Sequence, residues 1–243
     1  MNAFIDRIHP DWQATLERVL VLARLAKDQA VLVFDLDSTV FDNRPRQARI
    51  VREYGQKAGH PALLRCQAHH FESGWDLTGG VVKLGVSQAE AQAMEKELRR
   101  FWGARFFTSD YCRDDIEVVG APRFLAACVA TGAQVAYVTG RYEKMREGTL
   151  EALSRCGLPL PGGRVSLLMK PALRDSDDDY KRTAHGTLET MGRVVAAFDN
   201  EPIHANDYAR RFPEALVVHL ATDDSGREKT LVDRIVSIPH FAW

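Results

Sequence analysis

The segment that most constrains the fold is Val31-Leu-Val-Phe-Asp35-Leu-Asp37-Ser-Thr39-Val40, an apolar run that ends in two carboxylates one residue apart. A strand buried on both faces of a parallel sheet is typically a continuous apolar run, as residues 31–34 are. The acids follow where this strand leaves the sheet, and open α/β sheets bind ligands at the carboxyl ends of their strands. Because residues two apart in a strand or tight loop point the same way, Asp35 and Asp37 are predicted to converge.

Two convergent carboxylates repel each other unless a divalent cation lies between them or one carries a proton. The alternative is a solvated acidic turn in which Asp37 caps the next helix. An Asp-x-Asp pair alone does not separate these interpretations, but the rest of the chain favours the first.

The second half of the chain predicts a parallel sheet. An amphipathic helix is expected over residues 12–26, before the first strand. Further strands are expected at 135–138, 165–169, 194–198 and 215–220, and they alternate with helices expected around 122–131, 142–156, 179–191 and 204–211. Strands that alternate with helices form parallel sheets with right-handed crossovers. The predicted fold class is α/β, with a doubly wound, Rossmann-like core.

Roughly 95 residues separate the first two strands, far more than a usual connection of a few residues or one helix. Helices are expected in this insertion around 44–57, 61–71 and 87–102, and Leu77-Thr-Gly-Gly80 predicts a turn. Ser87 with Glu90 is a capping-box pattern at the start of the third helix. We therefore predict a core of residues 1–40 and 119–243, with residues 41–118 as an inserted helical cap over the crevice.

Composition narrows the class of protein. With 243 residues and a formal net charge of −1, the chain has no basic excess that would indicate nucleic acid or an anionic membrane as partner. It lacks a secretory signal pattern and any apolar run near the roughly 20 residues that span a bilayer. The four scattered cysteines predict reduced, buried thiols in a cytoplasmic protein. The sequence leaves the oligomeric state open, and the aromatic tail Phe241-Ala-Trp243 packs either on the core or on another subunit.

Each later strand also ends in a polar group of chemical use. Thr139 and Gly140 follow one strand, Lys170 follows the next, and Asp199 follows a third, while Lys181 lies near the start of the preceding helix. Singly, these residues are typical of a Ser/Thr turn, a helix cap or a solvated charge. Their combination at one sheet edge indicates a site.

Together these groups fit phosphoryl transfer through an aspartyl phosphate. A carboxylate can attack phosphorus and split one hard displacement into two easier ones. Mg²⁺ prefers oxygen ligands, which suits Asp35 and Asp199, and offsets the repulsion between carboxylate and phosphate. Thr139 and a lysine would hold the phosphoryl oxygens. Asp37 would protonate the leaving oxygen and then deprotonate the attacking water.

These residues resemble the haloacid dehalogenase-like (HAD) hydrolase superfamily. Its first motif is matched by Asp35-Leu-Asp37-Ser-Thr39-Val40, with Ser38 in place of a frequent glycine, its second by Thr139 and its fourth by Asp199. The usual second acid of the fourth motif is absent, because Asn200 and Ile203 occupy its places. Asn200 or Glu201 is then the candidate to complete a metal shell. The resemblance spans about residues 31–220.

The resemblance implies a role for each motif residue. Asp35 is the nucleophile, Asp37 is the general acid and base, and Asp35, the Asp37 backbone carbonyl and Asp199 bind Mg²⁺. Thr139 and Gly140 hold phosphate together with a lysine. Lys181 is favoured for this lysine over Lys170, since it begins the helix that leads into the Asp199 strand, at the end of a helix that attracts anions.

The second acid separates activities within the superfamily. A dehalogenase lacks it because a halide leaves without a proton, whereas a phosphatase or mutase must protonate an alkoxide. The insertion resembles the cap type placed after the first strand, which commonly implies small substrates. The expected function is thus a Mg²⁺-dependent phosphatase that acts on a small phosphorylated metabolite.

The same residues allow other interpretations. A phosphomutase or phosphotransferase would use the same acids with another acceptor, and a catalytically idle binding protein can share the fold. A phosphorylated receiver would carry its acceptor on a middle strand, where Thr139 stands. The arginines of the first cap helix, Arg44, Arg46, Arg49 and Arg52, form its solvated face or grip an anionic substrate group. The adjacent His69 and His70 lack spaced partners for zinc.

Overall fold

The computed structural model describes residues 4–243, which form two compact units. Residues 42–116 and 144–152 make up one, here called the helical unit. Residues 4–41, 117–143 and 153–243 make up the other, the sheet unit. This division differs from the predicted boundaries in assigning 144–152 to the helical unit. All of the candidate catalytic, phosphate-binding and metal-binding residues lie in the sheet unit, and the role of the insertion as a cap stays a prediction.

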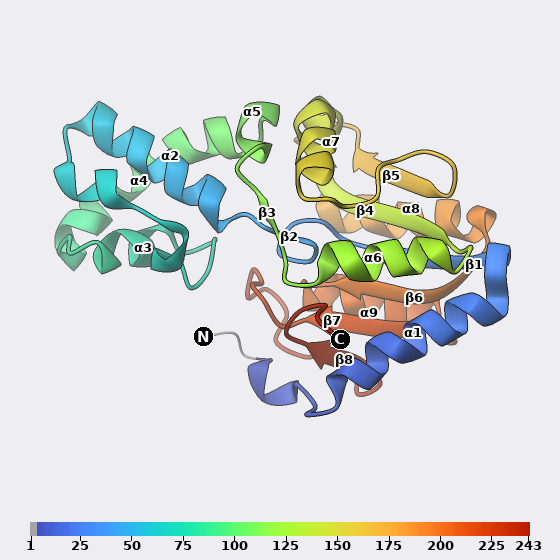
Figure 1. Cartoon of the computed structure of the whole chain (residues 1–243). Helices are drawn as coiled ribbons and strands as arrows, with labels where there is room; N and C mark the ends of the chain where they lie inside the picture. The colour runs from blue at the N-terminus through green and yellow to red at the C-terminus, as the bar shows by residue number, and fades with distance from the viewer. Residues whose placement is uncertain (1–3) are drawn as a thin grey trace. The chain divides into compact units, whose positions relative to one another are not determined.

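The sheet unit is built on a six-stranded sheet in the order β5-β4-β1-β6-β7-β8 (Figure 1). All its neighbouring strands run parallel. The strands are β1 (Ala30–Phe34), β4 (Gln134–Tyr142), β5 (Val165–Lys170), β6 (Arg193–Asp199), β7 (Leu216–Leu220) and β8 (Val236–Ile238). The chain moves outward from β1 through β4 to β5 and then returns to the other side of β1. This reversal is the point at which doubly wound sheets bind ligands, and the predicted fold class is confirmed.

Helices cover both faces of this sheet. In Figure 1, α1 (Trp12–Ala26) and α6 (Ala121–Ala130) lie on one face, and α8 (Asp177–Met191) and α9 (Pro202–Arg211) lie on the other. Strand β4 runs on to Tyr142 with a register shift after Thr139, so the predicted helix over 142–156 begins later, as η5 (Glu143–Met145) and α7 (Arg146–Arg155). Strand β8 was not expected, because three residues are too short for a sequence pattern.

Strand β1 is apolar throughout because both of its faces are covered. Val31 and Val33 pack in a cluster with residues of α8 and α9. Phe34 points to the opposite face and stacks on Phe198, with ring centroids 4.6 Å apart. The aromatic tail joins that side, since the buried Phe241 stacks on Phe124 at 5.5 Å. The tail therefore packs on the core of its own chain.

The helical unit contains α2 (Arg44–Ala58), η3 (Pro61–Arg65), η4 (Ala68–His70), α3 (Leu77–Lys83), α4 (Gln88–Phe106) and α5 (Ser109–Cys112). The helix expected over 61–71 is two short 3₁₀ helices. The turn predicted at 77–80 is wrong, because these residues begin α3, where the Asp76 carboxylate accepts a hydrogen bond of 2.7 Å from Gly79 N. Gly80 serves close packing instead, since a Cβ there would lie 2.4 Å from the Phe71 ring. At α4 the expected cap forms, with Ser87 Oγ 3.3 Å from Glu90 N.

The arginines of α2 do not form a uniformly solvated face. Arg46 is fully buried, and its Nε lies 2.8 Å from Asp115 Oδ1, with a second bond to the same carboxylate from Nη2. Arg49 pairs with Glu53 and Asp114 at the surface. The solvated-face interpretation is therefore wrong for Arg46. A buried guanidinium needs such a paired acceptor, because an unpaired charge in the interior is very costly.

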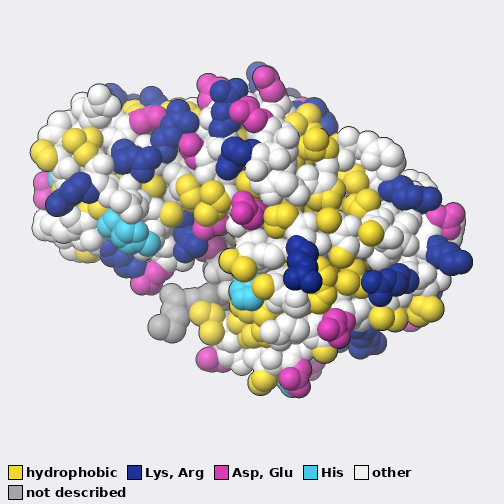
Figure 2. All heavy atoms as spheres, in the orientation of Figure 1, with side chains coloured by type: hydrophobic (Ala, Val, Ile, Leu, Met, Phe, Trp, Pro, Cys, Tyr) yellow, Lys and Arg dark blue, Asp and Glu magenta, His cyan; other side chains and the backbone are white. Residues whose placement is uncertain are grey.

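Short strands β2 (Phe41–Asp42) and β3 (Ile116–Glu117) pair where the chain crosses between the two units. The four cysteines are buried and unbridged, as predicted. Among residues 4–243, no helix is long and apolar enough to cross a membrane. On the face that Figure 2 shows, basic and acidic side chains are interspersed, as the near-zero net charge suggests.

Candidate active site

The loop after β1 places its first carboxylate beside the end of β6. Phe34 pairs with Phe198 in the sheet, and Asp35 N donates a hydrogen bond of 2.9 Å to Phe198 O. Asp35 is therefore held next to Asp199, the last residue of β6. The carboxyl ends of two adjacent strands thus bring together two acids that are 164 positions apart in the sequence.

Lys181 lies between these two acids. Its Nζ donates to Asp35 Oδ1 at 2.8 Å and to Asp199 Oδ2 at 2.7 Å. All three side chains are buried, with at most 6% of each exposed. Lys181 is in the second turn of α8, as the helix returns toward β6. Two buried carboxylates and one ammonium form a compact charged centre that water barely reaches.

Burial and charge shift the pKa values of this centre in different directions. Burial raises the pKa of Asp35 to about 7, although Lys181 opposes this shift. Burial also acts to raise the pKa of Asp199, but the Lys181 ammonium beside it acts in the opposite direction, and the pKa falls below its ordinary value. The pKa of Lys181 lies well above its ordinary value, because Asp199 and Asp35 outweigh its desolvation. The surroundings therefore favour the charged forms of Asp199 and Lys181, whereas burial disfavours the charged form of Asp35.

The second acid of the loop is held by Arg141. The Arg141 Nε lies 3.0 Å from Asp37 Oδ2, and Nη2 lies 2.6 Å from Asp37 Oδ1. This is the bidentate geometry that guanidinium groups form with carboxylates. The Arg141 backbone N–H donates to Thr139 Oγ1 at 3.1 Å, and its guanidinium lies over the Phe41 ring at 5.0 Å. The end of β4 therefore orients Asp37.

Gly140 and Lys170 meet at a different acid. A Cβ at Gly140 would fall 2.7 Å from Asp177 Oδ2, so a larger residue there would displace the half-exposed Asp177 side chain. Lys170 Nζ donates to Asp177 Oδ1 at 2.5 Å and to Leu173 O at 3.2 Å. Of the two candidate lysines, Lys181 is thus the one that contacts Asp35 and Asp199.

The loop itself is fixed by bonds to later segments. Ser38 has a φ of +57°, a left-handed conformation that glycine adopts at no cost and other residues adopt less readily. The Ser38 carbonyl accepts a hydrogen bond from Thr222 Oγ1, and Thr39 Oγ1 donates to Asn200 Oδ1 at 3.2 Å. These bonds tie the loop to the segments after β6 and β7.

The side chains of Asn200 and Glu201, which follow Asp199, form hydrogen bonds with other residues of the chain. Asn200 Nδ2 donates to Asp223 O, so both ends of this amide are used. The Glu201 carboxylate accepts from Ser225 N at 2.8 Å and from Ser225 Oγ at 2.7 Å. Burial raises the pKa of Glu201. We therefore leave Asn200 and Glu201 out of the proposed metal shell.

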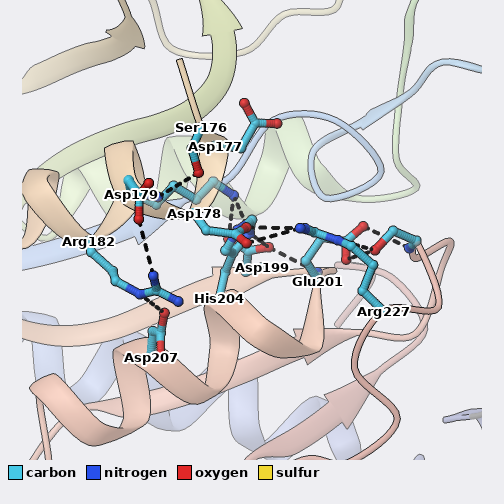
Figure 3. Close-up of polar contacts among 12 residues, drawn as sticks. Ser176, Asp177, Asp178, Asp179, Arg182, Asp199, Glu201, His204, Asp207 and Arg227 are labelled. Atoms are coloured by element: carbon cyan, nitrogen blue, oxygen red, sulfur yellow. Dashed lines mark hydrogen bonds and ion pairs between the residues drawn. The ribbon is translucent and has the colours of Figure 1, made fainter. Parts of the chain in front are cut away.

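A further set of residues near Lys181 was not predicted from the sequence. His204, on α9, contacts Lys181, and Asp178 contacts both His204 and Arg227 (Figure 3). Neither histidine-to-lysine spacing nor a known motif identifies them, because they meet only after α8 and α9 pack together. Arg141 had a signal in its position directly after Thr139-Gly140 at a strand end, but no role was assigned to it.

The donors at the centre suit Mg²⁺ better than a metal that needs a closed cage. Residues 4–243 contain no cluster of three or more His, Cys, Asp or Glu side chains arranged to hold a metal. Asp35 and Asp199 supply two carboxylates, and the Asp37 carbonyl would supply a third oxygen. Mg²⁺ is usually held by one or two carboxylates, with water and substrate phosphate completing its shell. Each carboxylate oxygen has two lone pairs, so the bonds from Lys181 leave capacity on both acids.

No family model matches the chain, and no curated protein matches it in sequence. Solved structures do match its fold. A protein assigned as a phosphatase from Clostridium difficile superposes with a TM-score of 0.53 at 10% identity, over 87% of this chain and 94% of that one. A protein assigned as a phosphoglycolate phosphatase from Lactobacillus delbrueckii subsp. bulgaricus gives 0.51 at 14% identity, over 87% and 94%.

A HAD-superfamily hydrolase of subfamily IA from Geobacter sulfurreducens gives a TM-score of 0.50 at 14% identity, over 88% of this chain and 92% of that one. At identities this low, the structural likeness shows the fold alone. The chemistry must be inferred from the residues of the site. The chain shares its fold with these three structures, one of which is described as a HAD-superfamily hydrolase.

Proposed function

We propose that this protein is a Mg²⁺-dependent phosphatase that hydrolyses a small phosphorylated metabolite through an aspartyl phosphate on Asp35. The observation that carries the proposal is the buried centre in which Lys181 contacts both Asp35 and Asp199. Asp37 lies two positions after Asp35 and is bound by Arg141. It lies at the carboxyl edge of the sheet, where doubly wound folds bind ligands. The likeness to structures described as phosphatases adds support at the level of the fold.

Asp35 is suited to the role of nucleophile. Within residues 4–243, Lys181 is its side-chain partner, and the bond goes to Oδ1. Oδ2 is then the oxygen that attacks phosphorus, as the bond from phosphorus to the leaving oxygen breaks. Mg²⁺ held by Asp35, the Asp37 carbonyl and Asp199 would balance the charge of the phosphate and favour the ionised form of Asp35.

Asp37 completes the proton transfers. In the first half-reaction its carboxyl group gives a proton to the leaving alkoxide. In the second half it takes a proton from water, whose oxygen attacks phosphorus and releases Asp35. Lys181, Thr139 and Gly140 are proposed to hold the phosphoryl oxygens, and the bidentate contact of Arg141 keeps Asp37 oriented between the two steps.

The substrate class and location belong to the same proposal. A helical insertion that acts as a cap favours small substrates, and the four buried thiols fit a cytoplasmic protein. We expect no nucleic acid and no membrane as partner.

The test is phosphate release from p-nitrophenyl phosphate and a panel of phosphorylated metabolites, with Mg²⁺ or with a chelator. We expect release that depends on Mg²⁺ and is absent in Asp35→Asn. Release that Asp35→Asn retains would contradict the proposal. Release only when an alcohol or sugar phosphate acceptor is added would indicate a phosphotransferase or mutase. A folded protein that binds phosphate without turnover would indicate an idle binding protein.

A further inference from the structure

His204 contacts the Lys181 ammonium in addition to the two acids Asp35 and Asp199. Its Nδ1 lies 3.1 Å from Lys181 Nζ, and its Nε2 lies 2.8 Å from Asp178 Oδ1. The side chain is buried, with 4% exposed. Nδ1 also lies 3.5 Å from Asp199 Oδ1. An ammonium group only donates hydrogen bonds, so in the shorter contact Nδ1 accepts from Lys181. The imidazole proton then sits on Nε2 and is donated to Asp178, which defines the tautomer from the partners alone.

The ring is anchored on its outer side by a chain of charged contacts. Asp178 lies in the first turn of α8, and Arg227 Nη1 donates to Asp178 Oδ2 at 3.0 Å (Figure 3). Arg227 Nε also donates to Ser225 Oγ at 3.0 Å, and Ser225 binds Glu201. These contacts form a continuous row from Arg227 through Asp178 and His204 to Lys181. The contacts on its two nitrogens fix the imidazole of His204 in one orientation.

We propose that His204 is a positioning residue that fixes the Lys181 ammonium for contact with the transferred phosphoryl group, and that Asp178 and Arg227 hold its ring. This inference rests on the proposed phosphatase function. Asp35, Asp199 and His204 together use the three N–H donors of Lys181, so a phosphoryl oxygen that contacts Lys181 must replace one of them.

The chemistry explains why a neutral imidazole is useful in this place. Asp35 changes its charge and partners when it is phosphorylated, and Asp199 is a proposed metal ligand, so neither is a constant partner for Lys181. A third carboxylate would hold the ammonium but would also repel the anionic substrate. The neutral Nδ1 of His204 holds Lys181 without adding negative charge, and displacement of a catalytic group by about 1 Å can cost roughly a hundredfold in rate.

If His204 had a purely structural role, activity would not depend more on its contact with Lys181 than on its contact with Asp178. In that role, His204 would tie α9 to α8 through Asp178, and its contact with Lys181 would be incidental. Two substitutions separate the contacts. In His204→Asn, the amide oxygen takes the place of Nδ1 and accepts from Lys181, but the side chain is too short to reach Asp178. In His204→Gln, the amide nitrogen takes the place of Nε2 and donates to Asp178, but the acceptor for Lys181 is lost.

The experiment measures kcat and KM for both variants with Mg²⁺ and p-nitrophenyl phosphate, together with urea unfolding. We expect His204→Asn to retain several times more kcat than His204→Gln, with His204→Gln reduced by about tenfold or more. His204→Gln should nevertheless be at least as stable as His204→Asn. Equal kcat values, or a higher kcat for His204→Gln, would overturn the proposal. His185 is a matched control, since it is a buried α8 histidine that packs against Tyr208, and its Asn and Gln variants should have similar kcat.

A spectroscopic readout keeps this inference distinct from the proposed function. Long-range ¹H–¹⁵N NMR of the wild-type histidines should show His204 with a proton on Nε2 and a hydrogen-bonded, unprotonated Nδ1. Lys181→Met should shift the Nδ1 resonance. An inactive wild-type enzyme with this spectrum would refute the phosphatase function but preserve the Lys181 contact. A protonated Nδ1, or a Nδ1 resonance unchanged by Lys181→Met, would overturn the inference whatever the activity.

Discussion

The Arg141 guanidinium contacts both oxygens of the Asp37 carboxylate, with Nε 3.0 Å from Oδ2 and Nη2 2.6 Å from Oδ1. Arg141 comes from the end of β4, and Asp37 comes from the loop after β1. Their pairing therefore fixes the direction of the proposed general acid from the neighbouring strand. A lysine could supply the charge but not the two parallel bonds.

Arg141→Lys is predicted to slow the cleavage of alkyl phosphates more than that of p-nitrophenyl phosphate. An alkoxide needs the proton that a well-oriented Asp37 supplies, whereas p-nitrophenolate leaves readily without it. We expect kcat for an alkyl phosphate to fall by about tenfold or more, within the range for impaired acid catalysis. Arg24→Lys, at an exposed position on α1, is the matched control. Equal losses on both substrates would show that Arg141 does not act through Asp37.

Lys181→Met is predicted to lower the free energy of unfolding of the metal-free protein by about 3–5 kcal/mol at pH 8, because it leaves two buried carboxylates without a cation. Without the ammonium, the folded state favours protonated Asp35 and Asp199, so acid stabilises the variant. The difference from wild type should therefore narrow between pH 8 and pH 5 in urea unfolding with chelator. Lys170→Met should cost less, since its partner Asp177 is half exposed. A difference that is independent of pH would contradict this account.

His219 is predicted to make the fold less stable in acid. Burial lowers its pKa from 6.5 to about 4, while its Nε2 donates to Asn200 O at 3.0 Å. His219 therefore takes up a proton near pH 6.5 in the unfolded chain, but only near pH 4 in the folded chain. Stability falls as the pH drops through this window, by up to about 3 kcal/mol.

His219→Gln tests this effect, because glutamine cannot take up the proton. The variant should lose less stability than wild type between pH 7 and pH 4.5 in urea unfolding. If the free energy of unfolding fell equally with pH in both proteins, the acid sensitivity would come from groups other than His219.

Arg46→Met is predicted to destabilise the protein by about 3–5 kcal/mol, since Asp115 would remain buried and unpaired by Arg46. Arg46→Met with Asp115→Leu should recover much of this loss, because an apolar pair removes the stranded charge. Arg44→Ala removes the ion pair between the half-exposed Arg44 and Asp42, and it should lower the free energy of unfolding by no more than about 1 kcal/mol. A double variant as unstable as the single one would show that Arg46 acts through other contacts.

Much of the sheet unit could be predicted because its patterns are strong. The run 31–34 is apolar without interruption, and the helix expected over 12–26 has the bounds of α1. The helical unit was harder, since Gly79 and Gly80 are typical of a turn, but here they lie in α3, where Gly80 packs against the Phe71 ring. Close packing of that kind depends on where the Phe71 ring lies in three dimensions, which a local sequence pattern does not contain.

The candidate site divides in the same way. Asp35 and Asp199 could be placed together because strand ends of a parallel sheet share one edge. Lys181 could be added because it lies near the start of the helix that leads into the Asp199 strand. His204 could not, because a histidine on an amphipathic helix is usually a core or surface residue. Its position beside Lys181 follows only from the packing of α9 against α8.

Trapping of the phosphorylated enzyme tests the central claim most directly. Asp37→Asn, mixed with Mg²⁺ and p-nitrophenyl phosphate, should still form the aspartyl phosphate because this leaving group needs no proton. It should hydrolyse the intermediate slowly, by roughly a hundred- to ten-thousandfold, because the attacking water lacks its base. After an acid quench, mass spectrometry should find one phosphoryl group on the peptide that contains Asp35, and none in Asp35→Asn. Phosphate release by the wild type with no phosphoryl group on that peptide would contradict the account.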